Sequence, residues 1–145
     1  MVTTDPCAGG SAARTAGEAM VRAPKTCGVG TTTGQARAFF ADDHVHALLV
    51  VDGVRLVAVV ERDDLAGPDQ QPVEELGRLE GRTVPPSEPV QVVAARLRAE
   101  GRRRTAVVDD TGRLLGLLCF KRSGRGFCTD ADVAARAADR DLLPA

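Results

Sequence analysis

The sequence predicts a mixed α+β (α/β) fold made of two β-α-β-β-α repeats related by a pseudo-twofold axis. The first observation is an internal repeat, because residues 25–52 can be laid over residues 82–109 with a constant offset and no gap. One extra residue in the second turn then brings residues 55–60 over residues 113–118. The second observation is that apolar runs with the period of strands alternate with helical patterns inside each copy. Neither copy has enough core alone, so we expect the two copies to bury a shared face.

Composition changes along the chain divide its 145 residues into four segments. Residues 1–14 are rich in Ala, Gly, Ser and Thr and are predicted to form a flexible tail. The first repeat covers residues 15–67, a polar linker covers residues 68–72, and the second repeat covers residues 73–145. One globule with a cleft between its halves follows from this division.

In the first repeat, we expect a lead-in helix followed by strand, helix, strand, strand and helix. Thr15 with Glu18 three residues later is typical of a capping box at the start of the lead-in helix. Asp52-Gly53 is typical of a hairpin turn. The expected elements are a helix over Thr15–Met20, a strand over Thr26–Val29, a helix capped within Thr31–Thr33 and running to about Asp42, strands over His46–Val51 and Arg55–Val60, and a short helix from Arg62 to Gly67-Pro68.

The second repeat is expected to follow the same order. Ser87 is the predicted cap of its main helix, with Pro89 allowed in the first turn. Asp110-Thr111-Gly112 predicts the second hairpin turn. The expected elements are a short helix over Val73–Leu79, a strand over Thr83–Val84, a helix after Ser87, strands over Thr105–Val108 and Arg113–Phe120, and a final helix from Thr129 to about Leu142.

Composition excludes several classes of function. The chain has no Trp, no Tyr and four Phe, so its core must be aliphatic. A formal net charge of −1 gives no general attraction to nucleic acid or to an anionic membrane. No apolar run approaches the roughly 20 residues that span a bilayer, and the N-terminus does not have the pattern of a secretory signal. We therefore expect a cytoplasmic protein that binds neither nucleic acid nor membrane.

The four cysteines, at positions 7, 27, 119 and 128, have no C-x-x-C spacing. Free thiols are the simplest interpretation in a reducing cytosol, with Cys27, Cys119 and Cys128 in or beside strands. A redox-responsive or metal-responsive site that combines some of them with His44 and His46 is an alternative without support from spacing. No spacing suggests a catalytic triad or a Cys/His pair, so the sequence does not predict an enzyme.

Each copy contains V-V-D before a turn and then an apolar strand, and this pattern resembles the CBS domain. Two such units in tandem resemble the CBS pair called a Bateman module, of the stand-alone bacterial type, over about residues 15–143. The resemblance implies a non-catalytic regulatory module that binds an adenine-containing ligand such as AMP, ATP or S-adenosylmethionine. It implies no required cofactor, a homodimer through apolar helix faces such as that around Phe39-Phe40, and a separate, unknown protein partner.

In CBS domains, the third strand runs into a pattern of Gly, a hydrophobic residue, any residue, Thr or Ser, two further residues and Asp. The hydroxyl lies near phosphate or ribose, and the Asp accepts hydrogen bonds from the ribose hydroxyls. In the first repeat, Asp64 fits the ribose position, but Glu61 replaces the hydroxyl residue. A carboxylate there would repel a phosphate, although Arg62 offers a compensating charge.

The second repeat offers two registers of this pattern. Continuing from Gly116 places Cys119 at the hydroxyl position and Arg122 at the acid position, which fails. Residues 126–132 match completely, with Cys128 beside Thr129 at the hydroxyl position and Asp132 as the ribose acceptor. This register, which we prefer, requires a loop over residues 121–125 and a short additional strand. Alternatively, Thr129 is only a helix cap and Asp132 only complements the helix dipole.

Two basic runs are further candidates for anion binding. Residues 121–126 are rich in Gly and Arg and could close over phosphates, but they do not contain the Lys-Ser/Thr end of a P-loop. Arg102-Arg103-Arg104 is the second run, and solvated surface is the simpler interpretation for it. A structural or interaction module that has lost nucleotide binding is therefore an alternative to the ligand sensor.

Overall fold

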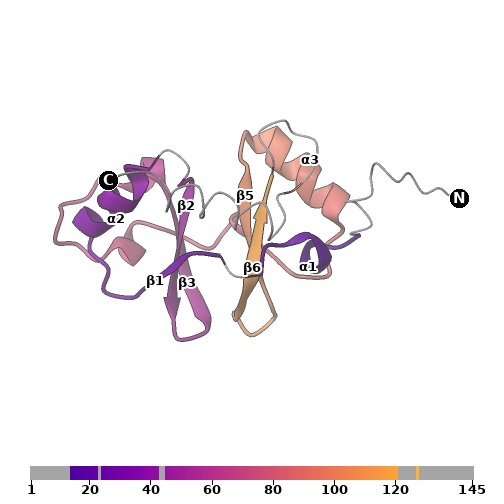
Figure 1. The fold of residues 1–145 in the computed structure, drawn as a ribbon, viewed down its shortest axis with the longest axis horizontal. Coiled ribbons are helices and arrows are strands. Elements are labelled where there is room, and N and C mark those ends of the chain that lie inside the picture. The colour runs from indigo at the N-terminus through magenta and orange to yellow at the C-terminus, as the bar shows by residue number, and fades with distance from the viewer. Residues whose placement is uncertain (1–13, 23, 43–44, 121–126, 128–145) are drawn as a thin grey trace, which may run out of the picture.

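The computed structural model describes residues 14–22, 24–42, 45–120 and 127. These residues form two three-stranded sheets with the orders β1-β2-β3 and β4-β5-β6, which stand side by side in Figure 1. In each sheet the first two strands are parallel and the last two antiparallel. The strands are β1 (Thr26–Gly28), β2 (Ala47–Asp52), β3 (Arg55–Glu61), β4 (Thr83–Val84), β5 (Arg104–Val108) and β6 (Leu114–Cys119). The predicted mixed fold with two repeats is confirmed.

The two copies agree down to a local irregularity in their hairpins. The pairing of β2 with β3 shifts register between Val50 and Val51, and the pairing of β5 with β6 shifts between Val107 and Val108. These are equivalent positions of the sequence repeat. Each hairpin turns through a glycine in the left-handed region, Gly53 with φ of 64° and Gly112 with φ of 88°, where side chains are disfavoured.

The helices agree with the sequence in position but not in every boundary. They are α1 (Ala16–Ala19), α2 (Thr33–Phe40), α3 (Val90–Glu100) and two 3-10 helices, η2 (Arg62–Asp64) and η3 (Val73–Glu75). The predicted capping box of Thr15 with Glu18 is present, and Thr32 forms a second one with Gln35. The predicted cap at Ser87 is wrong, because Pro89 is the N-cap of α3. A residue before the first helical position keeps an extended backbone, which proline readily adopts.

The short helices expected after Arg62 and over residues 73–79 are reduced to single 3-10 turns. Side-chain and main-chain contacts replace further helical turns. The Gly77 and Arg78 segment is held against β3, since Arg78 and Val59 exchange two backbone hydrogen bonds of 3.1 Å. The final helix expected from Thr129 lies outside the described residues.

The lead-in segment of each repeat packs on the other repeat's strands. Val21, from the start of the chain, exchanges backbone hydrogen bonds of 2.8 and 2.9 Å with Leu117 of β6. The equivalent pair in the other half is Arg78 with Val59 of β3. Figure 1 accordingly shows α1 beside β6, on the side of the molecule that carries α3. The two repeats are therefore interlocked rather than simply adjacent.

The linker at residues 68–72 takes part in this interlocking. The backbone N–H groups of Thr33 and Gly34, at the start of α2, donate to the carbonyl oxygens of Gln71 and Asp69. Arg37 of α2 forms an ion pair with Asp69. The linker thus satisfies amide groups at the N-terminus of a helix that would otherwise have no partner within the helix.

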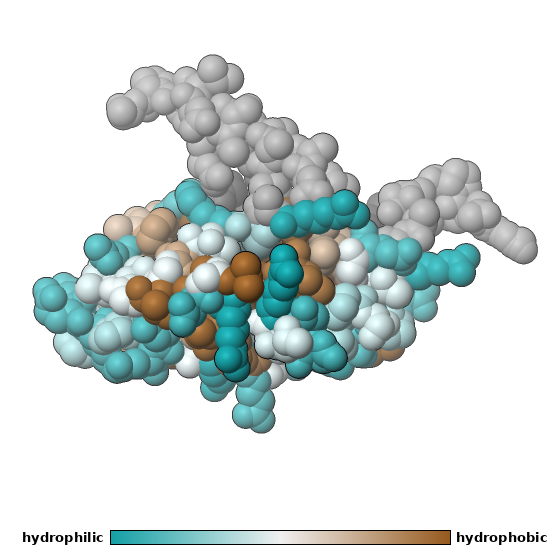
Figure 2. Space-filling model, turned by 90° about the horizontal axis from the view of Figure 1, so that it is seen from below, coloured by the Kyte–Doolittle hydropathy of each residue, from teal (hydrophilic) through white to brown (hydrophobic). Residues whose placement is uncertain are grey.

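The approximate twofold axis passes between the two hairpins. Arg55 and Arg113 form an isolated bridge, flanked by hydrogen bonds of about 3 Å from Leu56 to Gly112 and from Leu114 to Val54. A shared apolar cluster lies beside this pairing and contains Leu49, Leu56, Val59 and Ala106. Seen from below, hydrophobic residues gather in the middle of the face, with hydrophilic residues beside and around them (Figure 2). The predicted shared face is therefore built by residues of both sheets.

Each half also has its own core between its sheet and its helices. Ala36, Val50, Val60 and Val73 belong to the core of the first sheet, and a matching cluster covers the second sheet. Phe40 is 2% exposed, so it is part of this core and not of an exposed face of α2. Among the described residues, no helix is long and apolar enough to cross a membrane.

Candidate functional site

Charged side chains from both repeats meet where β3 ends and η2 begins. Arg82, just before β4, is 5% exposed and donates from Nη1 to the carbonyl oxygen of Val59 at 2.7 Å and to Oδ2 of Asp64 at 2.6 Å. Its Nη2 lies 3.3 Å from Oδ1 of Asp64 and 3.5 Å from Oε1 of Glu61. A buried guanidinium requires such partners, because an unpaired charge in this setting is costly.

Asp64, the predicted ribose acceptor of the first repeat, already accepts hydrogen bonds from other groups of the protein. Its carboxylate accepts hydrogen bonds from Arg82 and from the backbone N–H of Glu61 at 2.8 Å. Burial alone would raise the pKa of Asp64, but the hydrogen bonds from Arg82 and Glu61 and the charges of Arg82 and Arg78 together lower it. The carboxylate is therefore ionised at neutral pH and directed at Arg82.

Glu61, which replaces the expected hydroxyl residue, pairs with the second repeat. Its Oε2 accepts from Nη2 of Arg102 at 2.6 Å and from Nε at 3.0 Å. Arg102 also donates to the carbonyl oxygen of Gly81 at 2.7 Å and to Glu100 at 3.1 Å. The charge of Glu61 is thus neutralised mainly by Arg102, and not by Arg62 as the sequence suggested.

Arg62 has a different set of contacts. Its guanidinium donates to the carbonyl oxygens of Phe40 and Val45, and its Cζ lies 5.3 Å from the centre of the Phe40 ring. These contacts tie η2 to the end of α2 and to the start of the following segment. The side chain is therefore engaged in holding the first repeat together.

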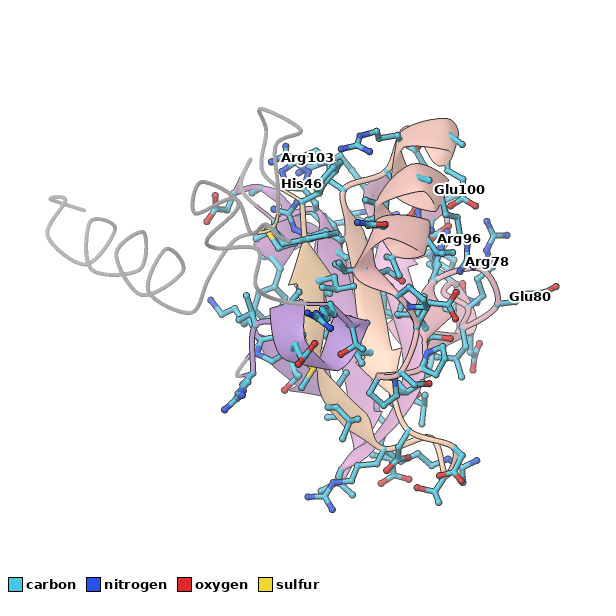
Figure 3. The ribbon with its side chains drawn as sticks, turned by 90° about the vertical axis from the view of Figure 1, so that its right-hand side faces the viewer. His46, Arg78, Glu80, Arg96, Glu100 and Arg103 are labelled. Carbon is cyan, nitrogen blue, oxygen red and sulfur yellow. The ribbon has the colours of Figure 1, made fainter. Side chains whose placement is uncertain are left out.

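Two hollows adjoin the Glu61–Arg102 pair, and both residues line both hollows. The larger hollow has a volume of about 470 Å³, and its other lining residues are Arg78, Glu80, Gly81, Arg82 and Glu100. The smaller one has a volume of about 200 Å³, and its other lining residues are His46, Arg62, Asp63, Gly101, Arg103 and Arg104. Figure 3 shows His46 and Arg103 close together at one end of the sheets, and Arg78, Glu80 and Glu100 along the side of α3.

Charge differs between the two hollows. Three arginines and three glutamates line the larger one, whereas four arginines face Glu61 and Asp63 in the smaller one. The run Arg102-Arg103-Arg104 is therefore not only solvated surface, because all three residues line the smaller hollow together with Arg62. Guanidinium groups gathered in this way suit the oxygens of a carboxylate or a phosphate.

The predicted site residues of the second repeat, Cys128, Thr129 and Asp132, lie outside the described residues. Phe127 is described, and it forms an antiparallel bridge with Phe120, with ring centroids 5.0 Å apart. Phe127 is thus paired with the residue that directly follows β6. The choice between the two registers stays a prediction.

Of the cysteines that the structure describes, Cys27 is a free thiol that is partly exposed, and Cys119 is buried. Cys27 lies in β1 and Cys119 ends β6. The pKa of Cys27 is raised, mainly by burial and in part by the charge of Glu74. The hydrogen bond with the hydroxyl of Thr31 opposes this shift. Within the described ranges, no group of three or more His, Cys, Asp and Glu side chains could hold a metal ion.

The sequence did not single out Arg82, the most buried charge of the site. A signal was present, because the repeat aligns Lys25 with Arg82 and thus places a basic residue before the first strand of each copy. Its partner Asp64 could not be inferred from local patterns. The pairing depends on the lead-in of the second repeat crossing over to β3.

A family comparison agrees with this architecture. The model of the CBS domain matches residues 16–67 and again residues 73–121. The chain belongs to the CBS domain family. No curated protein matches the sequence.

Solved structures of CBS proteins share the fold. A CBS domain protein of Thermoplasma acidophilum, TA0289, is 24% identical with a TM-score of 0.60, covering 87% of this chain and 76% of that one. The CBS pair of MJ0100, in complex with 5′-methylthioadenosine and S-adenosyl-L-methionine, is 20% identical with a TM-score of 0.57, covering 87% and 97%. The cytosolic domain of the magnesium channel MgtE, in complex with ATP, is 22% identical with a TM-score of 0.61, covering 85% of this chain. This chain spans 48% of that domain.

Proposed function

We propose that this CBS pair is a non-catalytic regulatory module that binds an adenine-containing ligand between its two repeats. The observation that carries the proposal is the Glu61–Arg102 pair, which joins the repeats and lines both hollows. A ligand in either hollow touches side chains of both repeats. It can therefore bias their packing to the extent that it binds one arrangement better than the other.

The choice of an adenine-containing ligand rests on the family. Two of the related structures are complexes, one with ATP and the other with 5′-methylthioadenosine and S-adenosyl-L-methionine. For this chain, Asp64, Glu61 and Arg62 are the proposed contacts in the first repeat, and Thr129, Asp132 and Cys128 those in the second. A separate protein partner would sense the change, and we expect the CBS pair to act as a homodimer.

Thermal stabilisation by a ligand panel tests the proposal. AMP, ATP, S-adenosylmethionine and NADH are each added to the purified protein at millimolar concentration. At one hundred times its dissociation constant, a ligand that binds only the folded state adds about 2.7 kcal/mol to the free energy of unfolding. A rise in melting temperature with at least one adenine compound, but not with guanosine or cytidine, is expected. Equal responses to all nucleosides would contradict the adenine assignment.

The substitution Asp132→Ala tests the second repeat's contribution. Removal of a carboxylate that accepts hydrogen bonds from ribose is expected to weaken binding by about 1.5–3 kcal/mol, measured by calorimetry. The control is Asp130→Ala, which removes the same charge two positions earlier. An unchanged affinity for the Asp132 variant would remove this residue from the site and reopen the choice of register.

A second candidate is a ligand-free interaction module, which one observation favours. Asp64 already accepts hydrogen bonds from a buried Arg82, so a ribose at this position must share or displace an existing partner. The same ligand panel separates the two functions. If no adenine compound raises the melting temperature, the module acts through protein contacts alone.

A further inference from the structure

The Glu61 carboxylate holds a position between two guanidinium groups of the second repeat. It accepts two hydrogen bonds from Arg102, of 2.6 and 3.0 Å, and its other oxygen lies 3.5 Å from Arg82. Arg82 is 5% exposed, so this arrangement brings a buried positive charge to the edge of the site. Two guanidinium groups around one anionic group is the arrangement by which arginines bind phosphate.

Among the residues that the structure describes, only Glu61 and Arg102 belong to the linings of both hollows. The pair is therefore a common wall of two spaces, a basic one of about 200 Å³ and one of about 470 Å³ with balanced charge. Because Glu61 belongs to both linings, rotation of its side chain would change both spaces at once. This rotation would also leave Nε and Nη2 of Arg102 without the Glu61 carboxylate as their acceptor.

Loss of Glu61 from the wall changes the charge of the smaller hollow. Arg62, Arg102, Arg103 and Arg104 would then face one carboxylate, that of Asp63. An anion of two or more oxygens could accept the hydrogen bonds that Glu61 gives up. A phosphate group has the charge and the oxygen geometry for this exchange, whereas a neutral nucleoside offers nothing in return.

We propose that the Glu61–Arg102 pair is a gate occupied by the protein's own anion, and that a phosphate group of the ligand opens it by replacing the Glu61 carboxylate on Arg102. This inference rests on the proposed function, and it names phosphate-bearing adenine nucleotides as the ligand class of this site. Since Glu61 ends β3 and Arg102 precedes β5, the exchange breaks an ion pair between the repeats each time the ligand binds.

Calorimetry on wild type and Glu61→Gln tests the gate, with AMP, adenosine and inorganic phosphate as the probes. The variant keeps the size of the side chain and removes its charge, so a phosphate no longer has to displace an anion. We expect affinity for AMP and for inorganic phosphate to rise about tenfold or more, and affinity for adenosine to stay within about twofold. Glu88→Gln, which removes one charge at the far end of α3 from Arg102, is the matched control and is expected to leave AMP binding unchanged.

An NMR measurement on the wild-type protein covers the case in which the variant does not fold. The Nε–H group of Arg102 donates to Glu61, so its proton signal reports on the gate directly. AMP and inorganic phosphate are expected to shift this signal, and adenosine is not. A signal that no phosphate compound moves would overturn the proposal.

Failure of the gate and failure of the proposed function are distinguishable. If AMP and adenosine bind wild type and Glu61→Gln alike, the gate is refuted and adenine binding stands. If inorganic phosphate binds the variant more tightly but neither AMP nor adenosine binds better than phosphate alone, the gate stands and the adenine function fails. If none of the three probes binds either protein, the gate is overturned, and the proposed function is overturned as well when ATP, S-adenosylmethionine and NADH also fail to bind.

Discussion

At the scale of single residues, Arg82 has the largest consequence for stability. Its guanidinium is buried. It donates hydrogen bonds to Asp64 and to the carbonyl oxygen of Val59, and it forms an ion pair with Glu61. Arg82→Met fills a similar volume but leaves the partly buried carboxylate of Asp64 without the cation that pairs with it, while Glu61 keeps Arg102. We expect the free energy of unfolding in urea to fall by about 3 kcal/mol, because breaking one side of a buried pair leaves an uncompensated charge.

An exposed ion pair supplies the control for Arg82. Arg96 lies 3.7 Å from Glu88, and its side chain is 45% exposed. Arg96→Met removes the same charge in solvent and is expected to cost less than about 1 kcal/mol. Equal losses for the two variants would mean that burial of Arg82 contributes nothing to the strength of its pairing.

The ionisation of Asp64 gives a prediction about acid stability. Its folded pKa lies below its ordinary value of 3.8, although burial opposes the shift, because Arg82 and the Glu61 N–H stabilise the charged form. A group with a lowered folded pKa contributes stability that is fully present above the unfolded pKa and is lost as pH falls through the folded value. The stability difference between wild type and Asp64→Asn should therefore be constant above about pH 5 and shrink below about pH 4.

Urea unfolding of both proteins between about pH 2.5 and pH 7 measures this difference across the titration of a carboxylate. Asn keeps the shape of the side chain but cannot ionise, so any pH dependence that both proteins share comes from other groups. A difference that stays constant down to the acid end of this range would show that the Asp64 carboxylate is not stabilised by the fold.

At the scale of elements, the crossing of each lead-in over the opposite strand requires one residue without a side chain. A Cβ built on Gly116 of β6 would lie 2.5 Å from the carbonyl oxygen of Val21 and 2.6 Å from Sδ of Met20. In the other half the glycine is on the lead-in, since a Cβ on Gly77 would lie 2.7 Å from the carbonyl oxygen of Val59. In one half the glycine that permits the crossing is in the strand, and in the other half it is in the lead-in segment.

Gly116→Ala is therefore expected to destabilise the protein by about 1–3 kcal/mol, the usual range for overpacking in a core. Gly28→Ala is the control, because a Cβ at this position would meet no atom within 4 Å beyond its chain neighbours, and Gly28 lies in a strand. This control should change stability by less than about 1 kcal/mol. The double variant Gly116→Ala with Met20→Gly recreates the other half's arrangement and should recover part of the loss. Thermal melts of the four proteins decide, and a neutral Gly116→Ala would show that β6 and the lead-in can separate at no cost.

Local patterns are sufficient to predict most strands and two of the capping residues. Val50 and Val107 occupy equivalent places because a short apolar run followed by a turn that contains Asp and Gly is a property of a short segment. The prediction of a cap at Ser87 is wrong, because the general preference for Ser at such positions is outweighed by the extended backbone that Pro89 adopts. The positions of strands along the chain and the capping residues depend on a few neighbouring residues. This part of the fold can therefore be predicted from a single sequence.

The candidate site is only partly predictable for the opposite reason. Glu61 and Asp64 are found by their spacing, but their partners Arg102 and Arg82 come from the other repeat. Such pairs depend on how the halves interlock, which no local pattern encodes. The adenine-binding interpretation comes from the family resemblance, and the paired state of the two carboxylates requires three-dimensional information.

At the scale of the whole molecule, interlocking means that each core contains a residue from the other repeat's sequence segment. Ala16, at the start of the first repeat, is fully buried in the core that covers the second sheet. Val73, its equivalent in the second repeat, is fully buried in the core of the first sheet. Damage at either residue should therefore loosen the half to which the residue does not belong by sequence.

Hydrogen exchange measured by mass spectrometry can observe this reciprocity, since local opening differs between parts of one protein. Val73→Ala, with an expected cost of about 2 kcal/mol, should speed exchange in β2 and β3 more than in β5 and β6. Ala16→Gly, with an expected cost of about 1 kcal/mol, should do the reverse. If each variant instead speeds hydrogen exchange in the strands of its own repeat, the lead-in segments do not stabilise the opposite repeat. If both variants speed exchange equally everywhere, the two halves unfold as one unit, and a ligand in either hollow would stabilise the whole CBS pair and not one half of it.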